Sequence, residues 1–359
     1  MIPTSAIRVP FDPKAARQTL FQALVAARRA HGGDTPALVD GDERALSYDT
    51  LVKGALALGH ALKRGTGNGE CIGVMLPTGA AAAVAVFALS AYGRVPTMIN
   101  FTSGAANILS ALKTARVTRI VTAHRFIKLG KLEDLAETLA GAATLIYLED
   151  VRAGLTLMDK ATAAAGSLMP SLVAARSDPD STAAILFTSG TEGAPKGVAL
   201  SHANILANVA QVRAHIALST SEDVLLNPLP AFHCFGLSVG TILPLLAGVK
   251  VVSHPTPLQP KEIVKRIKAH GVTILLATDT FIAQYARAGE DGDLDTVRLA
   301  VCGAERVRDE TRAFVRRKYG IQILEGYGVT EAAPVVAANQ PEANHPGPEG
   351  RLMAAMKAR

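Results

Sequence analysis

The chain has 359 residues, more than the roughly 250–300 at which a single core usually stops growing, so we expect at least two packed lobes. Its 49% apolar content indicates a globular protein, and its formal net charge of +6 suits an enzyme with anionic substrates and equally a soluble basic protein. The aromatic residues are not interleaved with the basic ones, which argues against a nucleic-acid-binding protein.

The first third of the chain alternates between helical and strand periodicity. Helical spacing covers residues 16–30, and 36–64 reads as a strand, an Asp-Gly turn, a short strand and a helix. Strands are then expected at 70–77, 95–100 and 118–123, with helices at 78–93 and 104–117 between them. The helix at 78–93 includes the most apolar run, which is too short for the roughly 20 residues that span a bilayer. We therefore expect no transmembrane segment.

Residues 159–182 are rich in Ala, Ser, Asp and Pro, and we interpret them as a connector between lobes. The alternation then resumes, which predicts largely parallel sheets with helices on both faces. Strands are expected at 183–188, 223–230, 249–254, 272–278, 298–305 and 321–328, and helices at 201–216, 237–248, 259–271 and 307–320.

The stretch "LFTSGTEGAPKG" suggests a polyphosphate-binding loop, because glycine-rich backbone, hydroxyls and a lysine form anion sites. It differs from the Walker loop, since Pro195 replaces the second glycine and Gly197 the magnesium-binding hydroxyl. Pro195 also disfavours a helix that begins directly at Lys196. The alternative is a glycine-rich surface turn, and a P-loop NTPase is a distant third.

Three other stretches carry candidate site residues. "GYGVTE" offers the ring of Tyr327, the hydroxyl of Thr330 and, in Glu331, a carboxylate of the kind that Mg²⁺ requires. "PLPAFHCFG" contains His233, although a single His in such a segment is more often a packed residue than a catalyst. "CGAE" places small residues at a strand end, where a flat ring could approach the backbone.

These four stretches occur in the order and spacing of the adenylate-forming superfamily, which includes acyl-CoA synthetases, luciferases and adenylation domains. "KLGKLEDL", "HANILANVAQ" and "ILEGYGVTEAAPVV" further resemble the synthetase half of bacterial acyl-acyl carrier protein synthetases, which are often fused to a 2-acylglycerophosphoethanolamine acyltransferase. The resemblance implies an α/β fold with two mostly parallel sheets flanked by helices, which is the family's large N-terminal domain.

The resemblance also implies roles for individual residues. The ATP phosphates would be bound by Thr188, Ser189, Gly190, Thr191, Gly193 and Lys196. The adenine and ribose side would be lined by Gly303, Ala304 and Glu305, with Tyr327 stacked on the base. Thr330 would contact the α-phosphate, Glu331 would hold Mg²⁺, and His233 would lie at the mouth of the acyl pocket. Glu192 departs from the family pattern, because a carboxylate repels a triphosphate unless it points away or pairs with a lysine.

The implied reaction is ATP-dependent activation of a fatty acid as an acyl-adenylate, followed by transfer to a thiol of coenzyme A or of the phosphopantetheine arm of acyl carrier protein. The alternatives are a coenzyme A ligase for a shorter or aromatic acid and a non-catalytic nucleotide- or acyl-binding module. Basic helix faces at 261–268 and 306–318 suggest docking of an acidic carrier protein, or simply a solvated surface.

The resemblance predicts lobes at 1–175 and 176–338, and the start of a β-rich segment at 339–359. The family's ribose-binding Asp and adenylation lysine are not found, so we expect a fragment that is truncated within the β-rich part, lacks the small C-terminal domain and is nearly inactive. Cys71, Cys234 and Cys302 show no C-x-x-C spacing, which suits a reducing cytoplasm. The inner face of the bacterial membrane is the other location that the resemblance implies for the parent protein.

Overall fold

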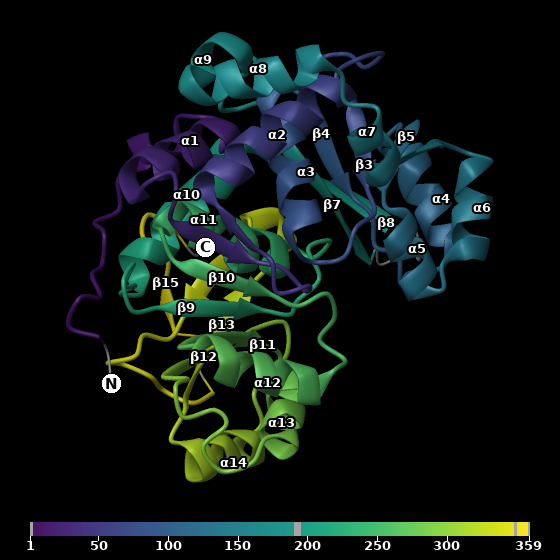
Figure 1. The fold of residues 1–359 in the computed structure, drawn as a ribbon. Coiled ribbons are helices and arrows are strands. Elements are labelled where there is room, and N and C mark those ends of the chain that lie inside the picture. The colour runs from purple at the N-terminus through teal and green to yellow at the C-terminus, as the bar shows by residue number, and fades with distance from the viewer. Residues whose placement is uncertain (1–2, 190–194, 348–349, 358–359) are drawn as a thin grey trace. The chain divides into compact units, whose positions relative to one another are not determined.

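The computed structural model describes residues 3–189, 195–347 and 350–357, and the chain divides into two compact units (Figure 1). The six-stranded unit consists of residues 16–35 and 46–204. The nine-stranded unit consists of residues 1–15, 36–45 and 205–359. The lobes predicted from the sequence differ from these units. Strand β7 (Thr182–Ser189) lies after residue 175 but pairs with β4 (Val95–Met98) in the six-stranded sheet, and residues 36–39 pair with β10 (Lys250–Ser253) in the nine-stranded one.

The six-stranded sheet is parallel except at one edge, where β7 and β8 form an antiparallel hairpin. In spatial order its strands are β6 (Thr144–Tyr147), β5 (Arg119–Thr122), β3 (Cys71–Val74), β4 (Val95–Met98), β7 (Thr182–Ser189) and β8 (Pro195–Ser201). Its helices are α1 (Leu20–His31), α2 (Tyr48–Leu62), α3 (Ala80–Ala91), α4 (Ala105–Thr114), α5 (His124–Gly130), α6 (Glu133–Ala140), α7 (Leu148–Ala153), α8 (Leu157–Leu168) and α9 (Pro170–Val173).

The prediction of a connector at 159–182 is wrong, because most of this stretch forms α8 and α9. A capping box between Thr156 and Asp159 starts α8, and its alanines favour the helix. Asp159 is fully buried and accepts hydrogen bonds from His60 Nδ1 at 2.6 Å and Arg64 Nη1 at 2.7 Å, which fixes α8 to α2.

The nine-stranded sheet has a parallel centre and an antiparallel edge. In spatial order its strands are β15 (Arg351–Leu352), β14 (Val335–Ala338), β13 (Gln322–Gly328), β12 (Leu299–Cys302), β11 (Ile274–Ala277), β9 (Val224–Asn227), β10 (Lys250–Ser253), β1 (Pro36–Val39) and β2 (Ala45–Ser47). Around it lie η1 (Pro13–Ala16), α10 (His202–His215), the π-helix η2 (Phe235–Ile242), α11 (Leu243–Ala247), α12 (Pro260–His270), α13 (Asp279–Ala288), α14 (Asp309–Tyr319) and the short η3 (Thr330–Ala332).

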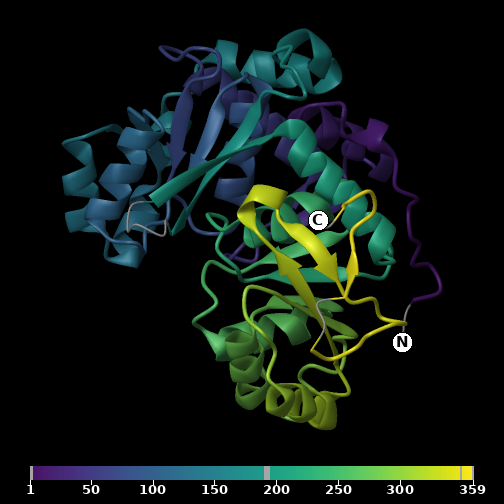
Figure 2. The same cartoon turned by 180° about the vertical axis from the view of Figure 1, so that it is seen from behind.

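The two faces of the nine-stranded sheet are covered by different helices. Side chains alternate along each strand, so Leu275, Ala300 and Cys302 join the buried core beneath α12, α13 and α14. On the other side α10 lies against β14 (Figure 2). Asn208 of α10 exchanges hydrogen bonds with the backbone of Val335 on β14, at 2.8 and 3.0 Å. Of the helices that the structure describes, none combines the length and the apolar composition needed to cross a membrane.

Candidate active site

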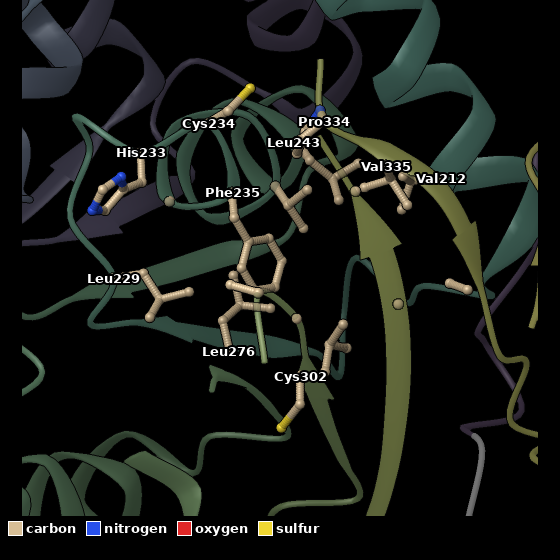
Figure 3. Close-up of a pocket in the computed structure, with 18 of the residues that line it drawn as sticks. Val212, Leu229, His233, Cys234, Phe235, Leu243, Leu276, Cys302, Pro334 and Val335 are labelled. Carbon is tan, nitrogen blue, oxygen red and sulfur yellow. The ribbon is translucent and has the colours of Figure 1, made fainter. Parts of the chain in front are cut away.

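A pocket of about 430 Å³ lies within the nine-stranded unit, on the face covered by α10 and η2 (Figure 3). Its mouth is formed where β11, β12 and β13 end, at Thr278, Gly303 and Gly328. Ligands of parallel α/β sheets bind in the crevice outside the carboxyl ends of the strands, so the position of the pocket is that of a substrate site.

The π-helix η2 forms one wall of the pocket, and Asn227 at the end of β9 fixes it in place. Asn227 Nδ2 donates to the carbonyl oxygen of Gly236 at 3.0 Å, and Asn227 Oδ1 accepts from the backbone N–H of Leu229 at 3.1 Å. A Cβ on Gly240 would lie 2.3 Å from the Asn227 amide, so glycine is needed where helix and strand approach each other. This contact positions the segment that carries His233 and Phe235 beside the pocket. The ring of Phe235 points into the pocket (Figure 3).

The mouth brings together five of the residues that the sequence predicted for the site. His233, Gly303, Ala304, Tyr327 and Thr330 all line the pocket. The Tyr327 ring is 44% exposed, which leaves a flat surface available for a base. Ala304 has a φ of +67°, a left-handed conformation that is uncommon outside glycine and is found at functional turns. Burial of the imidazole lowers the pKa of His233 below its usual value, so the ring is neutral near neutral pH.

The two predicted acidic residues lie beside the pocket and do not line it. Glu305 accepts hydrogen bonds from the backbone N–H and the hydroxyl of Thr280, at 3.2 and 3.0 Å, which holds it at the start of α13. Glu331 is exposed on η3. Burial, with a smaller contribution from the Glu331 carboxylate, raises the pKa of the Cys234 thiol to about 11, so the carboxylate lies near this wall.

Glu331 has the chemistry of a Mg²⁺ ligand when the other ligands come from a nucleotide. Within the described residues, no group of three or more His, Cys, Asp or Glu side chains could hold a metal by itself. Mg²⁺ is usually bound through one or two carboxylates together with substrate phosphates and water. One exposed carboxylate at a pocket mouth therefore fits this ion.

A buried ion pair supports the turn that carries Tyr327. Glu325 is 6% exposed and accepts hydrogen bonds from the backbone N–H of Val307, at 2.8 Å, and from Arg312 Nη2. Arg312 Nη1 also donates to the carbonyl oxygen of Ile323 at 2.9 Å. These bonds join the loop after β12 to β13. They hold in place the end of β13 from which Tyr327 extends.

The predicted phosphate loop belongs to the six-stranded unit and connects β7 to β8. Gly190, Thr191 and Gly193, and with them Glu192, lie outside the described residues. Thr188 and Lys196 are paired across the hairpin, next to the pair Ser189 and Pro195. Lys196 lies on a strand, which confirms that no helix begins there and separates this loop from a Walker loop.

The two basic helix faces are largely engaged in contacts within the chain. Six of the ten basic residues on or beside α12 and α14 bind carboxylates or backbone carbonyls, with one contact of each and its distance given in parentheses. They are Lys265 (Glu262, 2.8 Å), Arg266 (Asp40 O, 2.7 Å), Lys268 (Asp293, 2.9 Å), Arg308 (Asp279, 2.6 Å), Arg312 (Ile323 O, 2.9 Å) and Lys318 (Gly289 O, 2.6 Å). These contacts reduce the charge available to steer an acidic partner.

Sequence reasoning did not find the interior of the pocket. Its walls are apolar residues from strands and helices far apart in the chain: Val212, Ile216, Leu218, Leu225, Val239, Leu243, Ile274, Leu276, Leu299, Val301, Val335 and Met353. The alternation of Leu299, Val301 and Gly303 on one face of β12 was a signal that these residues share a surface. The sequence did not reveal that this surface borders a cavity.

Comparison with known proteins agrees with this geometry. Residues 25–359, about nine-tenths of the chain, match the sequence family described as AMP-binding enzyme. The chain belongs to that family. It is 30% identical over 319 residues to the sulfoacetate–CoA ligase of Cupriavidus necator, covering 88% of this chain and 61% of that protein. It is 28% identical over 298 residues to 4-coumarate–CoA ligase 5 of Oryza sativa subsp. japonica, covering 79% and 52%.

Solved structures show the same fold. A benzoate CoA ligase from Burkholderia xenovorans LB400 superposes with a TM-score of 0.81 at 20% identity, over 94% of this chain and 66% of that one. The anthranilate CoA ligase AuaEII, in complex with anthranoyl-AMP, superposes with a TM-score of 0.78 at 21% identity, over 96% and 64%. The predicted fold of two mostly parallel sheets flanked by helices is confirmed. The chain spans 61% and 52% of the length of the two curated relatives above.

Proposed function

We propose that this chain is the ATP-binding part of an AMP-forming ligase that activates a fatty acid as its acyl-adenylate and passes the acyl group to a thiol. The observation that carries the proposal is one pocket whose interior is apolar and whose mouth gathers His233, Ala304, Tyr327 and Thr330. An apolar interior suits an acyl chain, and a mouth with a flat ring and a hydroxyl suits a nucleotide.

In the first step a carboxylate oxygen of the acid attacks the α-phosphorus of ATP. The bond from that phosphorus to the bridging oxygen breaks, and pyrophosphate leaves. Both reactants are anionic, so the site must lower their repulsion and hold them in line. The neutral imidazole of His233 can donate a hydrogen bond to the acid without trapping it as an ion pair, and Thr330 can donate to the α-phosphate.

The phosphates need further positive charge and hydrogen-bond donors. We assign Thr188, Ser189, Gly190, Thr191, Gly193 and Lys196 to the β- and γ-phosphates, and Glu331 to Mg²⁺. The ion, when bound, neutralises phosphate charge. Gly303, Ala304 and Glu305 are assigned to the adenine and ribose side, and Tyr327 to the base.

In the second step a thiol sulfur attacks the acyl carbonyl carbon, AMP leaves with the bonding electron pair, and the thiol proton is lost to solvent. Coenzyme A and the phosphopantetheine arm of a carrier protein present the same thiol. The CoA-ligase names of the relatives favour coenzyme A, as does the engagement of the basic helix faces. A cytoplasmic location follows from either acceptor.

ATP–pyrophosphate exchange across a panel of acids tests the proposal, on this chain and on the longest protein that its gene encodes. We expect acid-dependent exchange in the longer protein, followed by thioester formation. Nucleotide binding without exchange for any acid would instead support a non-catalytic binding module. Steep loss of thioester formation with added salt, seen with carrier protein but not with coenzyme A, would favour the carrier.

A further inference from the structure

The inner end of the pocket is lined by residues from the amino ends of the same strands that form its mouth. Leu225, Ile274 and Leu299 line the pocket near the first residues of β9, β11 and β12. Ile216 and Leu218 complete this floor, and Ile216 and Leu299 lie in a buried cluster with Leu324.

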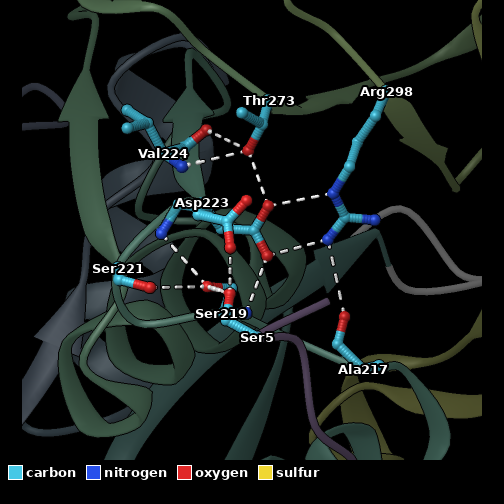
Figure 4. Close-up of polar contacts among 9 residues, drawn as sticks. Ser5, Ala217, Ser219, Ser221, Asp223, Val224, Thr273 and Arg298 are labelled. Atoms are coloured by element: carbon cyan, nitrogen blue, oxygen red, sulfur yellow. Dashed lines mark hydrogen bonds and ion pairs between the residues drawn. The ribbon is translucent and has the colours of Figure 1, made fainter. Parts of the chain in front are cut away.

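Residues next to the floor in the chain are joined by a polar network (Figure 4). Arg298, one residue before Leu299, donates through Nε and Nη2 to the two carboxylate oxygens of Asp223, at 2.9 and 2.8 Å. Thr273, one residue before Ile274, donates to Asp223 Oδ1 at 2.8 Å. We call Asp223, Thr273 and Arg298 the Asp223 clamp.

The segment that carries Leu218 is fixed on both sides. Arg298 Nη2 also reaches the carbonyl oxygen of Ala217 at 3.5 Å. The backbone of Leu218 pairs with that of Ile7, with both N–H to O distances at 3.1 Å. A chain that reached this floor would meet a buried salt bridge and paired backbone, so it could not extend further without breaking them.

The length of the pocket follows from strand geometry. Four residues separate Gly303 at the mouth from Leu299 at the floor, which corresponds to about 13 Å at roughly 3.3 Å per residue. An extended chain advances roughly 3.6 Å for three bonds, so about 13 Å accommodates roughly eleven bonds.

The lining also restricts the charge of the acid. Among the described residues that line the pocket, none is Asp, Glu, Lys or Arg, and the polar ones, His233, Thr278, Tyr327 and Thr330, lie at the mouth. A second ionised group at the far end of the acid would be buried without a partner, which is strongly unfavourable.

From these observations we infer that the pocket limits the length of the acyl chain. It takes straight-chain acids of about 8–12 carbons with a single charge. The inference rests on the proposed function and deepens it, because it names the acid. Leu299 sets the inner limit, and the Asp223 clamp keeps that limit in place.

Stable acyl-sulfamoyl adenosines with saturated chains of 4 to 18 carbons provide the test, with dissociation constants measured by calorimetry on this chain. Each methylene should tighten binding roughly fourfold until the floor is reached, from about 0.8 kcal/mol per buried methylene, and the gain should stop at 10–12 carbons. A gain that continued to 16 or 18 carbons, or no dependence on length, would overturn the inference. So would equal binding of the 12-carbon analogue that ends in a second carboxylate.

Two substitutions at Leu299 distinguish a role in limiting chain length from a general loss of stability. Leu299→Ala should lengthen the preferred chain by two or three carbons, and Leu299→Phe should shorten it. A damaged fold cannot shift the preference in opposite directions. Leu275→Ala, at a fully buried leucine on the opposite face of the sheet, is the matched control and should leave the preferred length unchanged. Identical length profiles for all these variants would remove Leu299 from the limit.

The outcomes also separate this inference from the proposed function. Exchange activity that is highest with acids of 16 carbons or more would leave the ligase proposal intact and overturn the length limit alone. Failure of every analogue to bind, together with no exchange for any acid, would overturn both.

Discussion

The two ends of the parallel strands in the nine-stranded sheet have opposite chemistry. At the amino ends the Asp223 clamp is closed: its carboxylate accepts from Arg298, Thr273 and the backbone N–H of Ser219, and Asp223 is 2% exposed (Figure 4). At the carboxyl ends small residues and an apolar wall leave a cavity, and the polar groups surround its mouth. The amino ends are thus closed by hydrogen bonds, whereas the carboxyl ends, apart from the Glu325–Arg312 pair that supports the turn to Tyr327, carry polar groups that face a cavity.

This difference shows how one sheet can combine stability with binding. A buried bidentate ion pair contributes only while both partners remain, and it resists local opening. A mouth that must accept and release ligands needs groups that are not already bonded to one another. Substitutions at the two ends should therefore affect different measurements, and five of them test this separation.

The largest effect is expected at the amino end, from Arg298→Met. The Asp223 carboxylate would remain buried without its cation, which costs about 3–5 kcal/mol in the free energy of unfolding. Urea denaturation followed by circular dichroism measures the loss. The matched control is Lys268→Met, which breaks an exposed ion pair between Lys268 and Asp293 and should cost far less. Similar losses in the two variants would contradict a special role for the Asp223 clamp.

The next effect is expected at the carboxyl end, from Glu331→Gln. Loss of the metal-binding carboxylate should lower pyrophosphate exchange by about 10²–10³-fold in the longest protein that the gene encodes. Unfolding should change by no more than about 0.5 kcal/mol, because the residue is exposed. Raising the Mg²⁺ concentration should restore part of the activity.

Glu310→Gln, at an exposed residue of α14, is the control for loss of one negative charge and should keep normal exchange. Near-normal exchange in the Glu331 variant would exclude this residue as the metal ligand.

Much of the fold could be predicted because its signals are local. The alternation of side chains along a strand, and the glycines at strand ends, can each be recognised from a few neighbouring residues. The site motifs were equally local, and five of the predicted residues meet at the pocket mouth. What could not be predicted depends on pairing between distant segments: residues 36–45 join the sheet of the C-terminal half, and β7 joins the sheet of the N-terminal half.

The residues missed at the site have the same explanation. Thr273 and Arg298 follow Asp223 by 50 and 75 positions, and each alone looks like an ordinary residue at the start of a predicted strand. The connector was misjudged for another reason: its Ser, Asp and Pro content is typical of loops, but Asp159 satisfies the start of α8 and bonds to α2.

A smaller effect is expected from Tyr327→Ala at the mouth. Stacking of a base on an aromatic ring is worth about 1–3 kcal/mol, so the dissociation constant for ATP should rise by roughly 10–100-fold. Tyr327→Phe retains the ring and should bind ATP normally, which distinguishes stacking from a role of the hydroxyl. Calorimetry with ATP and Mg²⁺ measures both. An equal loss in the two variants would show that the hydroxyl, not the ring, is responsible.

The smallest effects come from two threonines at the opposite ends of one strand, β11, and they give the most direct comparison of the two ends. Thr273 donates to Asp223 and accepts from the backbone N–H of Val224 at 3.0 Å, so Thr273→Val leaves the Asp223 carboxylate and the Val224 N–H each short of one bond. We expect a loss of about 1–2 kcal/mol in unfolding free energy and unchanged binding of a short-chain acyl-sulfamoyl adenosine, whose chain does not reach the floor. The hydroxyl of Thr278 accepts a long cap bond from the backbone N–H of Phe281 at 3.5 Å, and this side chain lines the mouth.

Thr278→Val should therefore cost less than about 1 kcal/mol in stability, but should weaken the same analogue by up to about tenfold, the value of one net hydrogen bond. Both threonines are partly buried, and both substitutions replace a hydroxyl with a methyl group, so size and burial are matched. Urea denaturation and calorimetry on the two variants give four numbers. If Thr273→Val weakened binding as much as Thr278→Val did, or if Thr278→Val were the more destabilising of the two, the two ends of the sheet would not divide stability and binding between them.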